Sequence, residues 1–152
     1  MPTLDTLPLD PAKATILVVD DGPYNHELIA GILGDRYNLV FALSGERALE
    51  IARGPHPPDC VLLDVLMPGL DGYDVCRELK ADARTRPIPV IFITAMQEIE
   101  DETKGFEVGC VDFIIKPISA AIVQARVATH VKLYRQERAL MALVRDAGIG
   151  GP

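Results

Sequence analysis

Five short apolar runs alternate with longer segments of helical periodicity along most of this 152-residue chain. The runs contain almost no internal polar residues, which is typical of parallel strands buried on both faces. The segments between them place apolar residues three or four positions apart, and four of the five end at or next to a glycine, as helices do. We expect strands at residues 16–19, 37–42, 60–63, 88–93 and 111–115. We expect helices at residues 23–33, 44–54, 73–83, 98–108 and 119–147.

This alternation predicts an α/β fold. Right-handed connections between consecutive parallel strands place helices on both faces of one sheet. We therefore expect a doubly wound, five-stranded parallel sheet. Residues 1–13 carry three prolines and no periodicity, which indicates an extended N-terminal arm. Residues 132–152 would extend the last helix into a flexible tail that acts as a linker or in dimerisation.

Composition excludes several classes of protein. The chain has 22 acidic and 15 basic residues and a net charge of −7, which argues against direct binding of nucleic acid. No stretch approaches the roughly 20 apolar residues that span a bilayer, and the first ten residues lack the features of a signal peptide. We expect a cytoplasmic protein with no membrane partner. Cys60, Cys76 and Cys110 are too widely spaced to indicate a zinc site or disulfides.

Polar side chains follow four of the predicted strands at their carboxyl ends. Asp20 and Asp21 follow the first strand, Asp64 the third, Thr94 the fourth and Lys116 the fifth. The carboxyl ends of parallel strands share one edge of the sheet, where open α/β sheets bind ligands. Each residue alone has an ordinary structural explanation, such as a helix start, a strand-end hydroxyl or a solvated charge. Their joint occurrence favours a functional site.

Three carboxylates at one point repel one another, so a cation or an ammonium group must compensate them. Mg²⁺ is the expected ion, with Mn²⁺ as the alternative, because it binds one or two carboxylates together with water and phosphoryl oxygens. A carboxylate can attack phosphorus to form an aspartyl-phosphate, while a metal and a lysine neutralise the equatorial oxygens. The site therefore indicates phosphoryl chemistry.

Four motifs at these positions, ILVVDD, VLLDVLMPGLDG, VIFITA and DFIIKP, resemble the receiver domain of two-component response regulators. The resemblance covers residues 13–129 and places the receiver domain at residues 14–131. It implies a flavodoxin-like strand order of 2-1-3-4-5. It also implies that Asp64 accepts a phosphoryl group from the phosphohistidine of a sensor histidine kinase or a phosphotransfer protein. Such a domain catalyses only its own phosphorylation and dephosphorylation.

The resemblance assigns roles to the other site residues. The implied ligands of Mg²⁺ are Asp21 directly, Asp20 mostly through water, Asp64 and the backbone carbonyl of Leu66. Thr94 and Lys116 would contact phosphoryl oxygens.

Residues near these ligands would control the state of the domain. Phe113 occupies the position of an aromatic switch, although a core aromatic is an equal alternative, and Lys116–Pro117 is expected to be a cis peptide. Leu66 and Met96 flank the approach of hydrolytic water and can neither orient nor deprotonate it, which predicts slow self-dephosphorylation.

The last predicted helix, residues 119–147, is longer than the sheet needs. It could fray after Tyr134, or it could serve as a dimerising or linker helix. It is mainly basic, whereas helix 98–108 is mainly acidic. We expect a weak homodimer through these two helices and strand 111–115, strengthened by phosphorylation. The chain could be a single-domain regulator or a fragment of a longer protein. The last helix resembles the exit helix of receivers that precede a cyclic-dinucleotide enzyme or sit in hybrid kinases, which favours a missing output domain of that kind.

Three other classes of function compete with this interpretation. A pure scaffold would leave the carboxylate cluster unexplained. A metal-dependent phosphohydrolase with an aspartate nucleophile usually has a second acid two residues later, where this chain has Leu66. A nucleotide-binding domain needs a glycine-rich turn after the first strand, and the sequence DDGPYN does not provide one.

Overall fold

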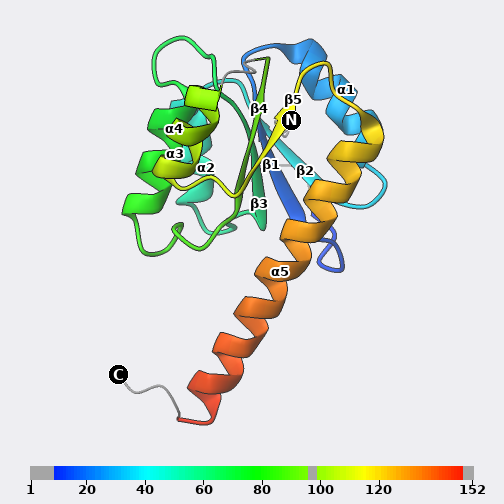
Figure 1. Ribbon diagram of the computed structural model, residues 1–152. Helices are drawn as coiled ribbons and strands as arrows, with labels where there is room; N and C mark the ends of the chain where they lie inside the picture. The colour runs from blue at the N-terminus through cyan, green and yellow to red at the C-terminus, as the bar shows by residue number, and fades with distance from the viewer. Residues whose placement is uncertain (1–8, 96–98, 149–152) are drawn as a thin grey trace.

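The computed structural model describes residues 9–95 and 99–148, with only the backbone of residues 99–102. Five strands and five helices alternate along the chain, as the sequence predicts (Figure 1). The strands are β1 (Thr15–Val19), β2 (Asn38–Ala42), β3 (Cys60–Asp64), β4 (Val90–Thr94) and β5 (Asp112–Ile115). The helices are α1 (Pro23–Leu33), α2 (Gly45–Ala52), α3 (Gly72–Ala81), α4 (Ile99–Val108) and α5 (Ala120–Asp146).

The strands form one parallel sheet in the order β2-β1-β3-β4-β5. Helices α1 and α5 cover one face, and α2, α3 and α4 cover the other (Figure 1). The predicted fold class and strand order are confirmed. Because β1 lies between β2 and β3, the chain reverses its direction of growth at β1, and the carboxyl ends of β1 and β3 become neighbours.

The core has two halves, one on each face of the sheet. Alternate residues of a strand point to opposite faces, so Leu17 and Val19 pack towards α2 and α3, whereas Ile16 and Val18 pack towards α1 and α5. Every residue of β3 is buried. This two-sided burial explains why the apolar runs show no alternation with polar residues.

Local chemistry sets several element boundaries. The Ser44 hydroxyl accepts a hydrogen bond from the backbone N–H of Arg47 at 3.2 Å and caps α2, which begins at Gly45. A capping box between Asp71 and Asp74 starts α3 at Gly72, one residue before the predicted start. Strand β4 begins at Val90, two residues later than predicted, because Pro89 has no N–H to donate to a neighbouring strand.

Helix α5 continues well beyond the sheet. Its 27 residues span about 40 Å. Tyr134 is its last buried residue, and the helix then projects away from the rest of the domain (Figure 1). Of the two alternatives for the last helix, fraying after Tyr134 is wrong, because regular helix continues to Asp146.

The described part of the N-terminal arm is hydrogen-bonded to the first residue of β2. The backbone of Asp10 exchanges hydrogen bonds with the Asn38 side chain at 2.8 and 2.9 Å. Residues 1–8 lie outside the described residues.

Among the described helices, none has the length and apolar character required to cross a membrane.

Candidate functional site

The carboxyl ends of β1 and β3 bring three carboxylates together. Asp20 and Asp21 follow β1 directly, and Asp64 is the last residue of β3. One side-chain oxygen from each lies within 4.8 Å of the others. Asp20 and Asp64 are each 6% exposed, whereas Asp21 is exposed to solvent. Two of the three charges are therefore largely removed from water.

Backbone and side-chain donors fix the orientation of the buried carboxylates. Asp20 accepts the N–H of Gly22 at 2.8 Å and the side-chain amide of Asn25 at 3.0 Å. Asp64 accepts the N–H of Leu66 at 3.3 Å. Asn25 was not among the predicted site residues. Its only sequence signal is its position in the first turn of α1, close after the acidic pair. These contacts hold the oxygens in place before any ligand arrives.

Lys116 brings an ammonium group to the same point from the end of β5. Its Nζ lies 3.8 Å from Asp64 Oδ2 and 3.9 Å from Asp20 Oδ2. The Lys116–Pro117 peptide is cis, and the backbone N–H of Lys116 donates to the carbonyl of Thr94 at 2.8 Å. One ammonium group faces three carboxylates, so the cluster retains net negative charge.

This imbalance acts on Asp64. Burial raises the pKa of the Asp64 carboxyl, and the carboxylates of Asp20 and Asp21 raise it further. The ammonium group of Lys116 and the N–H of Leu66 act in the opposite direction without cancelling the effect. A further cation would relieve this repulsion. The oxygen-only donor set fits a hard divalent ion such as Mg²⁺.

The loop after Asp64 folds back against the strand end. Gly72 donates its N–H to the carbonyl of Val65 at 2.9 Å. A Cβ at Gly72 would lie 2.5 Å from the carbonyl oxygen of Asp64, so only glycine allows this approach. Leu66, within the loop, is 62% exposed. The close backbone contact fixes where the loop begins and returns, beside the carboxylate cluster.

Thr94 and Phe113 occupy the neighbouring strands. Asp64 pairs with Ile93 of β4, so Thr94 lies one position further along the adjacent strand and is 2% exposed. Phe113, in β5, is buried, with ring centroids 5.6 Å from Phe92 and 5.2 Å from Phe106. This packing is compatible with a core aromatic and with a switch position.

The structure places five of the predicted site residues at one edge of the sheet: Asp20, Asp21, Asp64, Thr94 and Lys116. Met96 lies outside the described residues.

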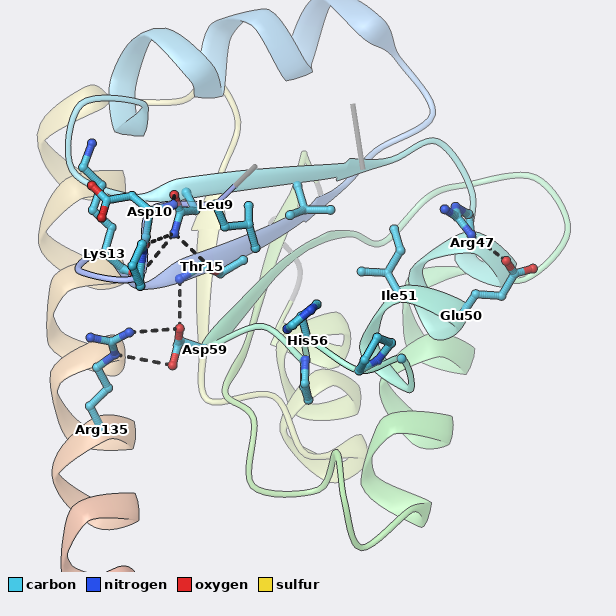
Figure 2. Close-up of a pocket in the computed structure, with 16 residues that line it drawn as sticks. Leu9, Asp10, Lys13, Thr15, Arg47, Glu50, Ile51, His56, Asp59 and Arg135 are labelled. Carbon is cyan, nitrogen blue, oxygen red and sulfur yellow. Dashed lines mark hydrogen bonds and ion pairs between the residues drawn. The ribbon is translucent and has the colours of Figure 1, made fainter. Parts of the chain in front are cut away.

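A groove of about 910 Å³ lies at the opposite edge of the sheet, where the strands begin (Figure 2). Its charged side chains largely compensate one another. Arg47 pairs with Glu50 at 2.7 Å, and Arg135 pairs with Asp59 at 3.4 Å. Asp20, Asp21 and Asp64 are not among the residues that line the groove, so the groove is separate from the carboxylate cluster.

Several known proteins are similar to this chain. The family model described as "Response regulator receiver domain" matches residues 16–128. The chain is 42% identical over 132 residues to a Vibrio cholerae protein named "Probable cyclic di-GMP phosphodiesterase", covering 87% of this chain. It is 46% identical over 128 residues to the response regulator PleD of Caulobacter vibrioides, covering 82% of this chain. The chain spans only 30% and 28%, respectively, of the lengths of these relatives.

A solved structure supports the same relationship. The receiver domain of the sensor histidine kinase PA1611 from Pseudomonas aeruginosa, solved with a magnesium ion coordinated in its active-site cleft, matches with a TM-score of 0.73 and 29% identity. The match covers 79% of this chain and 98% of that domain. With the family model covering most of its length, the chain belongs to the receiver-domain family of two-component response regulators.

Proposed function

We propose that Asp64 accepts a phosphoryl group from the phosphohistidine of a sensor histidine kinase or a phosphotransfer protein in the cytoplasm. The observation that carries this proposal is the position of Lys116 Nζ, 3.8 Å from Asp64 within a cluster of three carboxylates. In the transfer, an Asp64 oxygen forms a bond to phosphorus while the bond between phosphorus and the imidazole nitrogen breaks. The product is an aspartyl-phosphate.

The side chains around Asp64 prepare it for this reaction. The buried position of Asp64 excludes water from one side, and the N–H of Leu66 orients the carboxylate. Lys116 would pair with one phosphoryl oxygen, and the Thr94 hydroxyl would hydrogen-bond to another.

The metal would complete this arrangement. Asp20, Asp21, Asp64 and the backbone carbonyl of Leu66 would hold Mg²⁺, with Mn²⁺ as an alternative. The bound ion supplies positive charge to the transferring phosphoryl oxygens. The net negative charge of the cluster supports this assignment, as does the magnesium ion in the PA1611 receiver.

We further propose that the phosphoryl group is lost slowly. Leu66, which is 62% exposed beside Asp64, carries no group that can accept a proton from water. The domain would therefore hold its phosphorylated state for long enough to signal, and it would act on no other substrate.

The phosphorylated state would change the surface formed by α4, β5 and α5. Movement of Thr94 towards the phosphoryl group would let Phe113 turn further inward beneath α4. The resulting surface would form a weak homodimer through the acidic α4 and the basic α5. The side chains of residues 99–102, which carry much of that acidity, lie outside the described residues.

An output domain would receive this change in the whole protein. The Vibrio cholerae relative is named for an activity on cyclic di-GMP, and the present chain spans 30% of its length. A cyclic-dinucleotide enzyme or a kinase is therefore the output that we propose.

Intact mass spectrometry after incubation with Mg²⁺ and a small phosphodonor such as acetyl phosphate tests the proposal. We expect the wild type to gain about 80 Da, the mass of one phosphoryl group, and Asp64→Asn to gain nothing. Asp35→Asn, at an exposed loop position, is the matched control and should gain the same mass as the wild type. An unchanged mass of the wild type would contradict the proposal, and multiple turnover of phosphate esters would favour a phosphohydrolase instead.

A further inference from the structure

Helix α5 carries a stripe of exposed leucines that the domain itself does not cover. Leu133, Leu140 and Leu143 are 56%, 60% and 66% exposed. The exposed positions on this side of the helix alternate between steps of four and three residues, the spacing of a coiled-coil seam. They are Thr129, Leu133, Gln136, Leu140, Leu143 and Ala147.

The domain uses a different side of α5 for its own packing. Val123, Val127, Val131 and Tyr134 are buried against the sheet. Arg135, the next residue, forms an ion pair with Asp59, which also accepts the N–H of Thr15 at 2.8 Å (Figure 2). These contacts hold α5 where it leaves the domain. The later turns of α5 project away from the domain (Figure 1), and Leu133, Leu140 and Leu143 stay exposed.

Charges beside the stripe specify how it would pair. In heptad notation, Leu133 and Leu140 occupy the a positions, and Thr129, Gln136 and Leu143 the d positions. Lys132 then occupies a g position, and Glu137 the e position of the next heptad. In a parallel pair of helices these two positions face each other across the seam. Two copies of α5 would therefore form two symmetric Lys132–Glu137 contacts.

We propose that α5 pairs with α5 of a second copy of this chain, in parallel and in register, through the seam from Thr129 to Ala147. The leucines bury apolar area that is otherwise exposed to water. Gln136 at a d position favours a register in which the two amides meet. Thr129, the other polar member, lies at the end of the seam nearest the sheet. The seam is only about three heptads long and has two polar d positions, so the association is weak and depends on protein concentration.

This contact is separate from the surface proposed to respond to phosphorylation. It lies mainly on the part of α5 beyond Tyr134, and it requires no phosphoryl group on Asp64. Asp64→Asn should therefore leave the pairing of α5 unchanged. A failure of this pairing can thus be told apart from a failure of Asp64 to accept a phosphoryl group.

Sedimentation equilibrium over about 1 to 200 µM protein tests the pairing. We expect the wild type to shift from monomer to dimer in this range and Leu140→Glu to raise the dissociation constant at least about tenfold. Met141→Glu is the matched control, because Met141 is also apolar and is 57% exposed but lies outside the seam. It should remain within about twofold of the wild type. A wild type that stays monomeric, or equal effects of both variants, would overturn the proposal.

Charge exchange tests the register. Lys132→Glu and Glu137→Lys should each weaken dimerisation, because each places like charges across the seam. The double variant should recover the wild-type dissociation constant. Failure of the double variant to recover would exclude this parallel register.

Cysteine crosslinking tests the orientation. The native thiols Cys60, Cys76 and Cys110 are buried, so an introduced thiol provides the reactive position. The substitutions Thr129→Cys and Leu143→Cys lie about 21 Å apart along the helix. Parallel pairing predicts that each variant forms a disulfide with its own copy under mild oxidation. Antiparallel pairing centred on Gln136 would crosslink neither, and that result would overturn the proposal.

Discussion

The ammonium nitrogen of Lys116 lies 3.8 Å from a carboxylate oxygen of Asp64, across the intervening strand β4. This distance is an ion-pair distance and is too long for a direct hydrogen bond. The same nitrogen lies 3.9 Å from Asp20, so its charge is shared between two carboxylates. Asp64 therefore remains only partly compensated, and its pKa stays raised.

Removing the ammonium group should strengthen metal binding. Lys116→Met takes away a positive charge that repels a divalent cation, so we expect Mg²⁺ to bind more tightly, on the order of tenfold. Phosphorylation by acetyl phosphate should fall at the same time, because a phosphoryl oxygen loses its partner. Calorimetric titration with Mg²⁺ measures the first effect and intact mass the second. Lys13→Met, at the opposite edge of the sheet, is the control and should change neither Mg²⁺ affinity nor phosphorylation. An unchanged Mg²⁺ affinity in Lys116→Met would contradict the electrostatic explanation.

The raised pKa of Asp64 makes stability depend on pH. The folded state binds a proton at Asp64 more tightly than the unfolded state does. The free energy of unfolding therefore falls as pH rises from the pKa of Asp64 in the unfolded state to its raised pKa in the folded state. Without metal, Asp64→Asn should be more stable than the wild type at pH 7, because the neutral amide removes the repulsion with Asp20. Urea unfolding from pH 3 to 8 measures the difference.

Two controls belong to this experiment. The curves of the two proteins should approach each other at the acidic end of the range, where Asp64 is protonated in both states. Saturating Mg²⁺ should stabilise the wild type more than Asp64→Asn. A wild type that is more stable than Asp64→Asn at pH 7 without metal would show that Asp64 is not under net repulsion.

A polar group at position 66 should shorten the lifetime of the aspartyl-phosphate. Leu66→Asn places an amide that can orient water beside Asp64, and we expect dephosphorylation to accelerate about tenfold. Decay of the phosphorylated mass with time measures the rate. Leu43→Asn is the matched control, because Leu43 is 55% exposed and follows β2 at the same edge of the sheet. Equal decay rates in the wild type and Leu66→Asn would contradict the proposed role of Leu66.

The glycine behind Asp64 should be intolerant of any side chain. A Cβ at Gly72 would lie 2.5 Å from the carbonyl oxygen of Asp64 and 2.8 Å from the Cα of Val65, and both are backbone atoms. We expect Gly72→Ala to lower the free energy of unfolding by about 1 to 3 kcal/mol, the usual cost of overpacking. The shifted backbone should also reduce phosphorylation of Asp64.

Gly31→Ala provides the comparison for this substitution. Gly31 lies within α1, where a Cβ would meet nothing within 4 Å. Alanine favours a helix over glycine by about 1 kcal/mol, so this variant should be stabilised. Thermal unfolding should show a lower midpoint for Gly72→Ala and a higher midpoint for Gly31→Ala than for the wild type. A Gly72→Ala variant as stable as the wild type would show that the loop after β3 can shift freely.

The sequence predicted the five strands, their parallel arrangement and the polar residues at their carboxyl ends. It could do so because strands buried on both faces leave uninterrupted apolar runs, and each run ends where a polar residue begins. Several details could not be predicted. The start of α3 depends on reciprocal hydrogen bonds between Asp71 and Asp74, and the role of Asn25 depends on where its amide reaches Asp20.

By itself, the sequence determined an α/β chain and the set of residues that collects at one sheet edge, because periodicity and strand direction are local properties. Tertiary structure decided how these residues interact. Strand order places Asp20 beside Asp64 and brings Lys116 to both, while Asp21 stays exposed. Tertiary structure also decided that α5 leaves the domain after Tyr134. Arg135, the next residue, already pairs with Asp59, just before β3 begins, so the later turns have no core to cover.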